Sequence, residues 1–218
     1  MNGYFCWDNP NRSVISDTYL TVAAPSQGLY KDKGSRFLAF AYPIFSETEV
    51  KPIVDALKAE YYDARHHCYA WRLGIDASEG GVRFRANDDG EPAGSAGRPI
   101  LGQLLSRELT NLLVVVVRYF GGIKLGVPGL IAAYKEATAD ALAGAEIVER
   151  TENRAITVEF PYLAMNEVMR AVKEMAPEVL GQEFDLACRL RLSVRLRDAE
   201  SLVRRMEGIE GVNVSLSS

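Results

Sequence analysis

The alternation of hydrophobic and polar residues predicts an ordered series of strands and helices over the first 150 residues. Segments rich in aromatic and β-branched residues indicate strands at 35–42, 66–73, 81–86 and 112–119. The last of these is apolar at odd and even positions alike, which is typical of a strand covered on both faces. We therefore expect 112–119 to lie at the centre of a sheet.

Three helices are predicted by apolar residues spaced three and four apart. The first begins with a capping box from Ser46 to Glu49, and Pro52 should kink this helix or delay its start. The other two begin near Pro99 and Pro128, because proline is favoured in a first helical turn. The residues expected to face the core are Val50, Ile53, Val54, Leu57 and Tyr61, then Leu101, Leu104, Leu105 and Leu109, then Leu130, Ile131, Tyr134, Ala137 and Ala141.

The pattern begins again near residue 152, with strands predicted in RAITVEFPY, VLGQEFD, ACRLRLSVRLRD and GVNVSLS. A helix over 165–175 follows the first strand, and a short helix capped by Asp198 and ended by Gly208 follows the third. The order β-α-β-β-α-β is that of ferredoxin-like domains. We therefore expect an α+β protein of two domains, residues 1–150 and 151–218.

Composition and charge narrow the classes of protein that fit. The chain has 218 residues, 48% of them hydrophobic and 25% charged, as globular proteins do. Its formal net charge of −4 argues against broad wrapping of nucleic acid and leaves room only for a local basic patch. The longest apolar run, 112–117, is far shorter than the roughly 20 residues of a membrane span. We therefore expect no membrane partner.

The N-terminus and the cysteines indicate the compartment. The first residues lack the basic and apolar segments of a signal peptide. Cys6, Cys68 and Cys188 are odd in number and far apart, so a disulfide framework is not expected. Both observations favour a cytoplasmic protein.

Two glycine-containing loops of opposite charge flank the second helix and the central strand. The acidic loop, residues 87–97, offers the carboxylates of Asp88, Asp89 and Glu91. The glycine-rich loop, residues 118–126, offers cations and flexible backbone, and its candidate phosphate- or RNA-binding residues are Arg118, Gly121, Gly122, Lys124 and Gly126. A loop between a strand and a helix is a context in which backbone N–H groups bind phosphate. The spacing fits neither the P-loop nor the dinucleotide fingerprint, so no nucleotide cofactor is predicted.

Each loop also has a purely structural interpretation. The glycines would then serve only a tight turn and close packing. The carboxylates would be turn residues, or would pair with Arg98, Arg118 or Lys124 across the loops. Contact with a ligand, and binding of a metal or catalysis, are the alternatives for the acidic loop.

The run His66-His67-Cys68 suggests metal binding, but neighbours on a strand point to opposite faces and cannot converge unaided. A structural or hydrogen-bonding role is favoured. We therefore predict no metal site, and no residue is assigned a catalytic role, since two adjacent histidines and scattered cysteines form no nucleophilic arrangement.

Arginines recur at two-residue spacing in the second half of the chain. Arg189, Arg191, Arg195 and Arg197 would project from one face of a strand, where they could contact RNA phosphates or stack on bases. The alternative is a solvated face in which they pair with Glu159 or Glu183 on neighbouring strands. A β-bulge would break the alignment.

The segments DDGEPAGSAGRPIL and VVVVRYFGGIKLGVPGLIAAY, preceded by SRFLAFAYPI and HHCYAW, resemble the Impact/YigZ family over about residues 30–145. The remainder resembles the C-terminal domain of bacterial members. The resemblance implies an N-terminal domain like domain 2 of ribosomal protein S5 and a C-terminal domain like the last domain of translocating elongation factors. One departure is Val127-Pro128, where members commonly have small residues or glycine, and Pro128 removes an amide donor.

The resemblance also implies a link to translation. Eukaryotic members act in translational control by interfering with the activation of a kinase that phosphorylates an initiation factor. They carry an RWD domain that we do not expect in this chain, so the kinase role is not transferred. The bacterial-type architecture implies a cytosolic protein related to translation or RNA.

Three hypotheses of function follow. The first is a non-enzymatic regulator that binds RNA or the ribosome through the glycine-rich loop and the arginine-bearing sheet face. The second is an enzyme acting on a small phosphorylated or nucleotide ligand, with Asp89 as base and Lys124 holding phosphate, a fold-level analogy. The third is a module that binds a partner protein. No cofactor is predicted, and the oligomeric state and any enzymatic turnover stay open.

Overall fold

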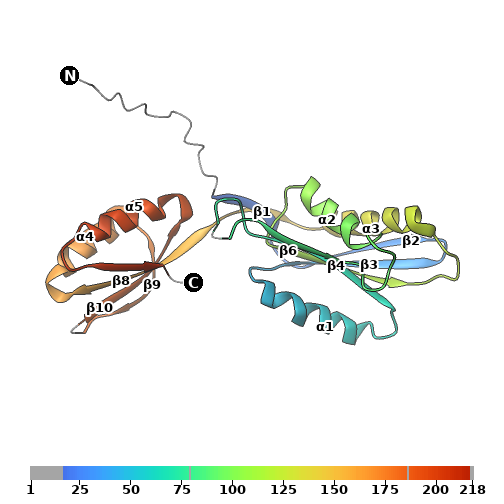
Figure 1. Ribbon diagram of the computed structural model, residues 1–218, viewed down its shortest axis with the longest axis horizontal. Helices are drawn as coiled ribbons and strands as arrows, with labels where there is room; N and C mark the ends of the chain where they lie inside the picture. The colour runs from blue at the N-terminus through green and yellow to red at the C-terminus, as the bar shows by residue number, and fades with distance from the viewer. Residues whose placement is uncertain (1–16, 79, 186, 217–218) are drawn as a thin grey trace, which may run out of the picture. The chain divides into compact units, whose positions relative to one another are not determined.

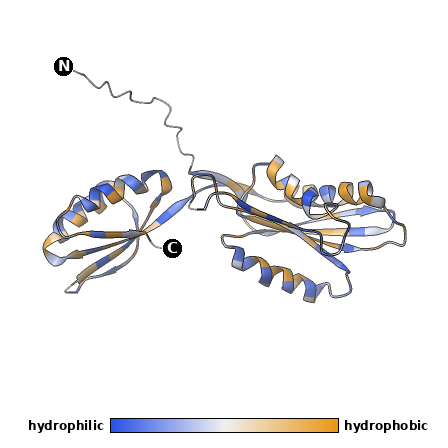
Figure 2. Cartoon of the chain, viewed as in Figure 1, coloured by the Kyte–Doolittle hydropathy of each residue, from blue (hydrophilic) through white to orange (hydrophobic). Residues whose placement is uncertain are grey.

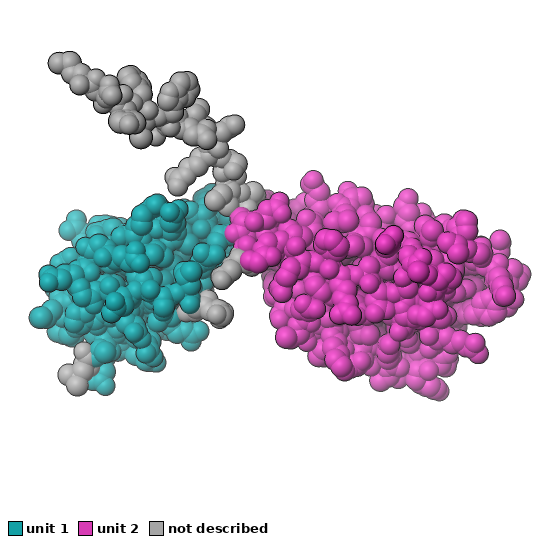
Figure 3. All heavy atoms as spheres, in the orientation of Figure 1, with its two compact units in different colours: residues 1–17, 151–218 teal, residues 18–150 magenta. Residues whose placement is uncertain are grey.

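The computed structural model describes residues 17–78, 80–185 and 187–216, so Cys6 lies outside the described residues. The chain divides into two compact units, shown in different colours in Figure 3. The larger unit is Thr18–Arg150, and the smaller unit is the chain from Thr151 onward together with Asp17. None of the helices in these described ranges is long and apolar enough to cross a membrane.

The larger unit is built on a five-stranded antiparallel sheet (Figure 1). Its strands, in spatial order, are β2 (Ser26–Asp32), β3 (Ser35–Pro43), β6 (Leu112–Tyr119), β4 (His66–Leu73) and β5 (Arg83–Asn87). The apolar segment is therefore the central strand, as predicted. Two further strands, β1 (Thr18–Val22) and β7 (Ile147–Thr151), pair in a separate ribbon.

Helices cover both faces of this sheet. The helix α1 (Val50–Glu60) lies on one face, and α2 (Gly97–Ser106) and α3 (Gly126–Ala143) lie on the other (Figure 1). Alternate residues of β6 enter two cores: Leu112, Val114 and Val116 pack with α2 and α3, and Leu113, Val115 and Val117 pack with α1. This double coverage explains why β6 has no polar face.

The predicted helices are present, with some differences in detail. The capping box is confirmed: the Ser46 hydroxyl accepts the N–H of Thr48, and Glu49 accepts the N–H of Ser46 at 2.7 Å. It opens the short helix η1 (Glu47–Glu49), and α1 then starts at Val50 with Pro52 in its first turn. The inward placement of Leu105 and Ile131 was wrong, since these side chains are 47% and 40% exposed.

The smaller unit contains a second antiparallel sheet, in the order β11 (Asn213–Leu216), β8 (Asn153–Pro161), β10 (Ala187–Arg195) and β9 (Glu178–Glu183). The helices α4 (Met165–Met175) and α5 (Leu196–Glu207) cover one face, and the short helix η2 (Tyr162–Ala164) precedes α4. Figure 2 shows both hydrophilic and hydrophobic residues on α1, α4 and α5, as expected for helices with one face on a sheet and one in water.

Two predictions at the end of β10 were wrong. The strand ends at Arg195 and α5 begins at Leu196, so Arg197 lies on a helix and not on the sheet face. Asp198 lies in the first turn of α5, whose N-cap is Arg195, and makes no cap. Gly208 does end the helix.

Candidate functional site

Asp88 organises the acidic loop from within. Its carboxylate accepts the backbone N–H groups of Gly94, Ala96 and Gly97 at 2.8, 3.0 and 2.8 Å. Burial opposes ionisation of Asp88, but these donors outweigh it and lower the pKa of the carboxyl below its ordinary value. Because α2 begins at Gly97, the Asp88 carboxylate accepts backbone N–H groups that have no acceptor within that helix, and its role is structural.

Asp89 ties the same loop to two neighbouring elements. It has a left-handed backbone, with φ of 39°. Its carboxylate accepts the N–H of His67 at 2.7 Å and lies 3.1 Å from Lys58 Nζ. Both acceptor oxygens thus face β4 and α1, which agrees with the turn and ion-pair interpretation.

Glu91 lies in a buried chain of polar groups. Its Oε1 accepts hydrogen bonds from Arg118 Nη1 and, at 2.9 Å, from the Tyr134 hydroxyl. Cys68 Sγ lies 3.3 Å from that hydroxyl and 3.0 Å from the carbonyl oxygen of Asp88. Burial raises the pKa of both Cys68 and Tyr134, so the thiol and phenol stay protonated. Pairing across the two loops, one of the alternatives above, is therefore confirmed for Glu91 and Arg118.

Arg118 is buried because it continues the inward row of β6. It follows Val114 and Val116 at two-residue spacing, and its cross-strand neighbours are Phe37 and His66. The side chain is 7% exposed, its guanidinium lies against the rings of Phe37 and Phe120, and Nε has no hydrogen-bond partner among the described residues. Its guanidinium charge is thus already paired inside the protein, which weakens the predicted role as a phosphate ligand.

The glycines of the glycine-rich loop do two different things. A Cβ on Gly121 would lie 1.9 Å from the carbonyl carbon of Gly34, and the Gly121 N–H already donates to the Ser35 hydroxyl. Gly121 therefore serves close packing. Gly122 and Gly126 have positive φ, and a Cβ there would meet no backbone of the described chain. These two permit the chain to turn without touching another segment.

The two loops border one hollow, a feature on which the predicted site depended. The hollow has a volume of about 760 Å³, and the acidic loop reaches it only through Glu91 and Pro92. The remaining lining residues are Asp63, Ala64, Arg65, His66, Arg118, Tyr119, Phe120, Lys124, Leu125, Gly126, Val127 and Leu130. Lys124 makes no ion pair with any residue in the described part of the chain. It is therefore a cation available to a bound anion.

The start of α3 forms part of this lining. The helix begins at Gly126 without a side-chain cap from any described residue, and Gly126 and Val127 both line the hollow. The first N–H groups of a helix lack intrahelical acceptors. Pro128 has no N–H to add, so the donors on this side come from the residues before it.

The carboxylates of the hollow are already engaged. Asp63 accepts a hydrogen bond from the Tyr119 hydroxyl at 2.7 Å, which raises the pKa of Tyr119 to about 12. Glu91 is held by Arg118 and Tyr134. Asp89, the base of the enzyme hypothesis, does not line the hollow, so the structure does not bring it together with Lys124.

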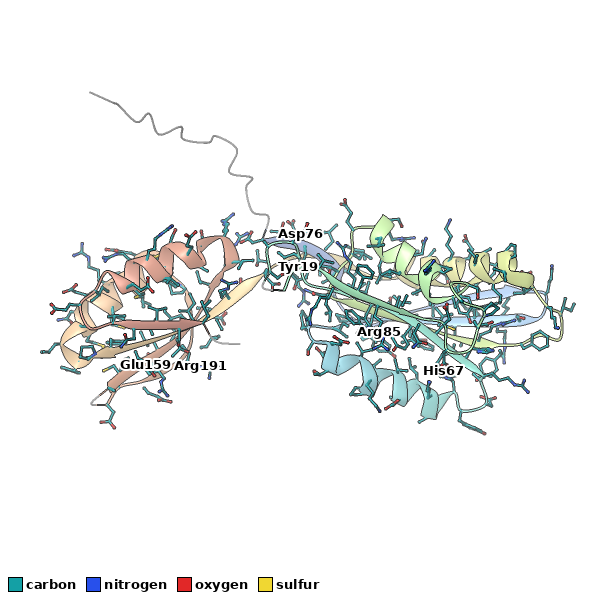
Figure 4. The ribbon with its side chains drawn as sticks, viewed as in Figure 1. Tyr19, His67, Asp76, Arg85, Glu159 and Arg191 are labelled. Atoms are coloured by element: carbon teal, nitrogen blue, oxygen red, sulfur yellow. The ribbon has the colours of Figure 1, made fainter. Side chains whose placement is uncertain are left out.

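No group of three or more potential metal ligands converges among the described residues, the His66-His67-Cys68 run included. His66 lines the hollow and its Nδ1 lies 2.9 Å from the carbonyl oxygen of Asp89. His67 (labelled in Figure 4) is buried, and its Nε2 has no partner within the described ranges. Burial lowers the pKa of His67 in spite of the nearby Asp89 charge.

The arginine stripe of β10 is mostly paired with acids. Arg189 binds Glu159 at 2.6 Å and lies 3.8 Å from Glu183, and these contacts raise the pKa of its guanidinium. Arg195 binds Asp17, and Arg197, on α5, lies 3.9 Å from the same carboxylate. The solvated, paired face is therefore confirmed for Arg189.

Arg191 is the exception within this stripe. It lies opposite Thr157 and Gly181 and makes no ion pair with a described residue (Figure 4). The β-bulge is present, but the extra residue belongs to β9, so β10 keeps its alternation of exposed and buried side chains.

Sequence reasoning missed several residues of the hollow. Arg65 and Phe120 line it and were not singled out, and Tyr134, which does not line it but binds Glu91, was assigned only to the core. A signal existed for Phe120: it follows a strand directly, is aromatic, and is exposed in the structure. No periodic pattern marks Arg65, which lies in the turn between α1 and β4.

Comparison with known proteins places this two-unit chain in one family. The Impact N-terminal domain matches residues 33–142, and the chain belongs to the Impact family. The family member YigZ of Escherichia coli is 32% identical over 178 residues, covering 82% of this chain and 86% of that protein. The member YvyE of Bacillus subtilis is 34% identical, covering 72% and 70%. A crystal structure described as a hypothetical protein covers 94% of this chain and 98% of its own, with 28% identity and a TM-score of 0.68.

Proposed function

We propose that this protein is a cytoplasmic, translation-related regulator that binds RNA, on its own or in the ribosome, through the hollow of the larger unit. The observation that carries the proposal is the joint placement of Lys124 and the uncapped start of α3 in one concave surface. Helix starts and lysines favour phosphate groups. Membership of the Impact family, whose eukaryotic members act in translational control, supports the link to translation.

The fold supports the same proposal. We assign the larger unit to the ribosomal protein S5 domain 2-like type. The strand order β11-β8-β10-β9 with both helices on one face is consistent with a ferredoxin-like domain resembling the last domain of translocating elongation factors. Its open sheet face contributes Arg191 as a second contact to RNA, in place of the full arginine stripe.

The test is filter binding of structured RNA and of ribosomes over a salt series. Removing the cation that binds one phosphate should reduce the slope of log affinity against log salt by about 0.7 to 0.9. Lys124→Ala and Arg191→Ala are each expected to weaken binding and flatten the slope. Lys135→Ala, on the exposed side of α3, and Arg170→Ala, on α4, are the matched controls and should bind like the parent protein.

Binding that does not respond to salt, or that is unchanged in both Lys124→Ala and Arg191→Ala, contradicts the proposal. A partner that is captured equally well after nuclease treatment would instead support the protein-interaction hypothesis.

A further inference from the structure

We infer that the hollow receives one unpaired nucleotide of a bound RNA, with the phosphate at Lys124 and the start of α3 and the base against the apolar wall. This inference rests on the proposed function and specifies the part of the RNA that is recognised. It follows from the two kinds of group that line the hollow, polar and apolar, and from the small number of unpaired cations among them.

Part of the lining of the hollow suits a single phosphate. Lys124 precedes the start of α3, and an 18-residue helix places partial positive charge at its first turn. Arg118 also lines the hollow, but it is more than nine-tenths buried and pairs with Glu91, so Lys124 is the cation that a phosphate would meet.

Other residues of the same lining suit an uncharged planar group. Phe120 is 56% exposed, and Leu125, Val127 and Leu130 continue the apolar lining. The Arg118 guanidinium carbon lies 5.7 Å from the centre of the Phe120 ring, which holds the ring in place. A fixed aromatic ring is the platform on which unpaired bases stack. A volume of about 760 Å³ is within the range of sites that enclose small ligands.

A paired RNA helix fits this chain less well. Duplex binding needs several cations along an extended surface. Here the net charge is −4, and among the residues that line the hollow only Arg65 and Lys124 are cations without an ion pair in the described part of the chain. Only one or two phosphates can therefore be bound at the hollow.

A peptide also fits less well. Extended peptides commonly bind by adding a strand to a sheet edge. The strand that ends at the hollow, β6, is paired with β3 and β4 on both sides, so it offers no edge. Recognition must come from the loops and the start of α3, which suit a compact anion better than a backbone.

The experiment measures fluorescence anisotropy with two RNA probes: a hairpin with an unpaired uridine loop, and a blunt duplex of the same stem. The hairpin should bind about tenfold or more tightly than the duplex. Its salt slope should be shallow, about −0.7 to −1.4, as expected for one or two phosphates of a single strand. Uridine monophosphate should compete with the hairpin.

Phe120→Ala and Phe84→Ala form a matched pair, because the two rings are 56% and 59% exposed and only Phe120 lines the hollow. Phe120→Ala should weaken hairpin binding about tenfold, and Phe84→Ala should not. Phe120→Leu and Phe120→Tyr separate stacking from folding, since tyrosine should retain the affinity that leucine loses.

The outcomes distinguish this inference from the proposed function. Equal binding of duplex and hairpin, a steep salt slope, or full affinity in Phe120→Leu would overturn the single-nucleotide site while RNA binding stands. Absence of binding to either RNA and to ribosomes would remove the proposed function itself. Competition by an acidic peptide but not by uridine monophosphate would assign the hollow to a protein partner and so overturn the inference.

Discussion

At the scale of single residues, the ion pair between Arg118 and Glu91 is almost completely withdrawn from water. Removing charges from water costs several kcal/mol for each ion, so such a pair needs further hydrogen bonds to persist. Tyr134 supplies one to the carboxylate, and the rings of Phe37 and Phe120 flank the guanidinium. Because the pair joins the acidic loop to the end of β6, it fixes one wall of the hollow.

Removing one partner of this pair should destabilise the protein strongly. Arg118→Met leaves Glu91 buried without its cation and is expected to lower the free energy of unfolding by about 3 to 5 kcal/mol. Glu91→Gln leaves Arg118 charged but keeps an acceptor for Tyr134. The double variant buries no charge, so its loss should be smaller than the sum of the two single losses. Chemical denaturation of the four proteins gives the cycle, and additive losses would contradict a direct interaction.

From the sequence, ion pairing between the acidic loop and a cation was one of several interpretations. The sequence did not decide which cation would pair. Arg98, Arg118 and Lys124 are all near in sequence to glycine-rich turns, and only the folded sheet decides which one points inward. The signal for Arg118 was present in β6, where it extends the row of Val114 and Val116. Since both faces of that strand are apolar, a cation at its end also had to be buried and paired.

At the scale of elements, most strands were predicted from the sequence, the edge strands β5, β9 and β11 among them, but the edge strand β2 was not. β6 and β4 carry long apolar patterns, whereas β2 has no fully buried residue and alternates only between half-buried and exposed positions. The short ribbon of β1 and β7 was also missed. The end of β10 was missed because arginine and leucine continue to alternate into the first turn of α5.

The glycine-rich loop should be sensitive to a methyl group at one glycine and tolerant at its neighbour. In Gly121→Ala the new Cβ would lie 1.9 Å from the Gly34 carbonyl carbon and 2.2 Å from Ser35 N, so the turn between β2 and β3 must move. We expect a loss of about 3 kcal/mol in the free energy of unfolding. Gly122→Ala meets no described atom within 4 Å and should lose only about 1 kcal/mol, from its φ of 89°.

Thermal and urea unfolding of the two glycine variants measure this difference. Equal losses would mean that the close approach of the two turns does not decide the cost at Gly121. Such a result would also remove the steric requirement for glycine at position 121.

At the scale of the whole molecule, each unit has its own hydrophobic core. The larger unit has one on each side of its sheet, and the smaller unit has one between its sheet and its two helices. The smaller unit is not continuous in sequence, because Asp17 belongs to it. The Asp17 carboxylate accepts two hydrogen bonds from Arg195, and its carbonyl accepts the N–H of Glu152.

Asp17→Asn should therefore destabilise the smaller unit alone. The side chain is buried, and its hydrogen bonds to Arg195, against the effect of burial, lower the pKa of the carboxyl below its ordinary value of 3.8. A lowered folded-state pKa means that the stabilisation is present above that ordinary value and is lost as pH falls through the folded-state pKa.

We expect Asp17→Asn to lower the free energy of unfolding by about 1.5 to 3 kcal/mol at neutral pH, as for hydrogen bonds to charged groups. In scanning calorimetry the transition of the smaller unit should move to lower temperature while that of the larger unit stays. The difference in transition temperature between Asp17→Asn and the parent protein should disappear on acidification. A difference that persists below the folded-state pKa would show that the charge of Asp17 is not the cause.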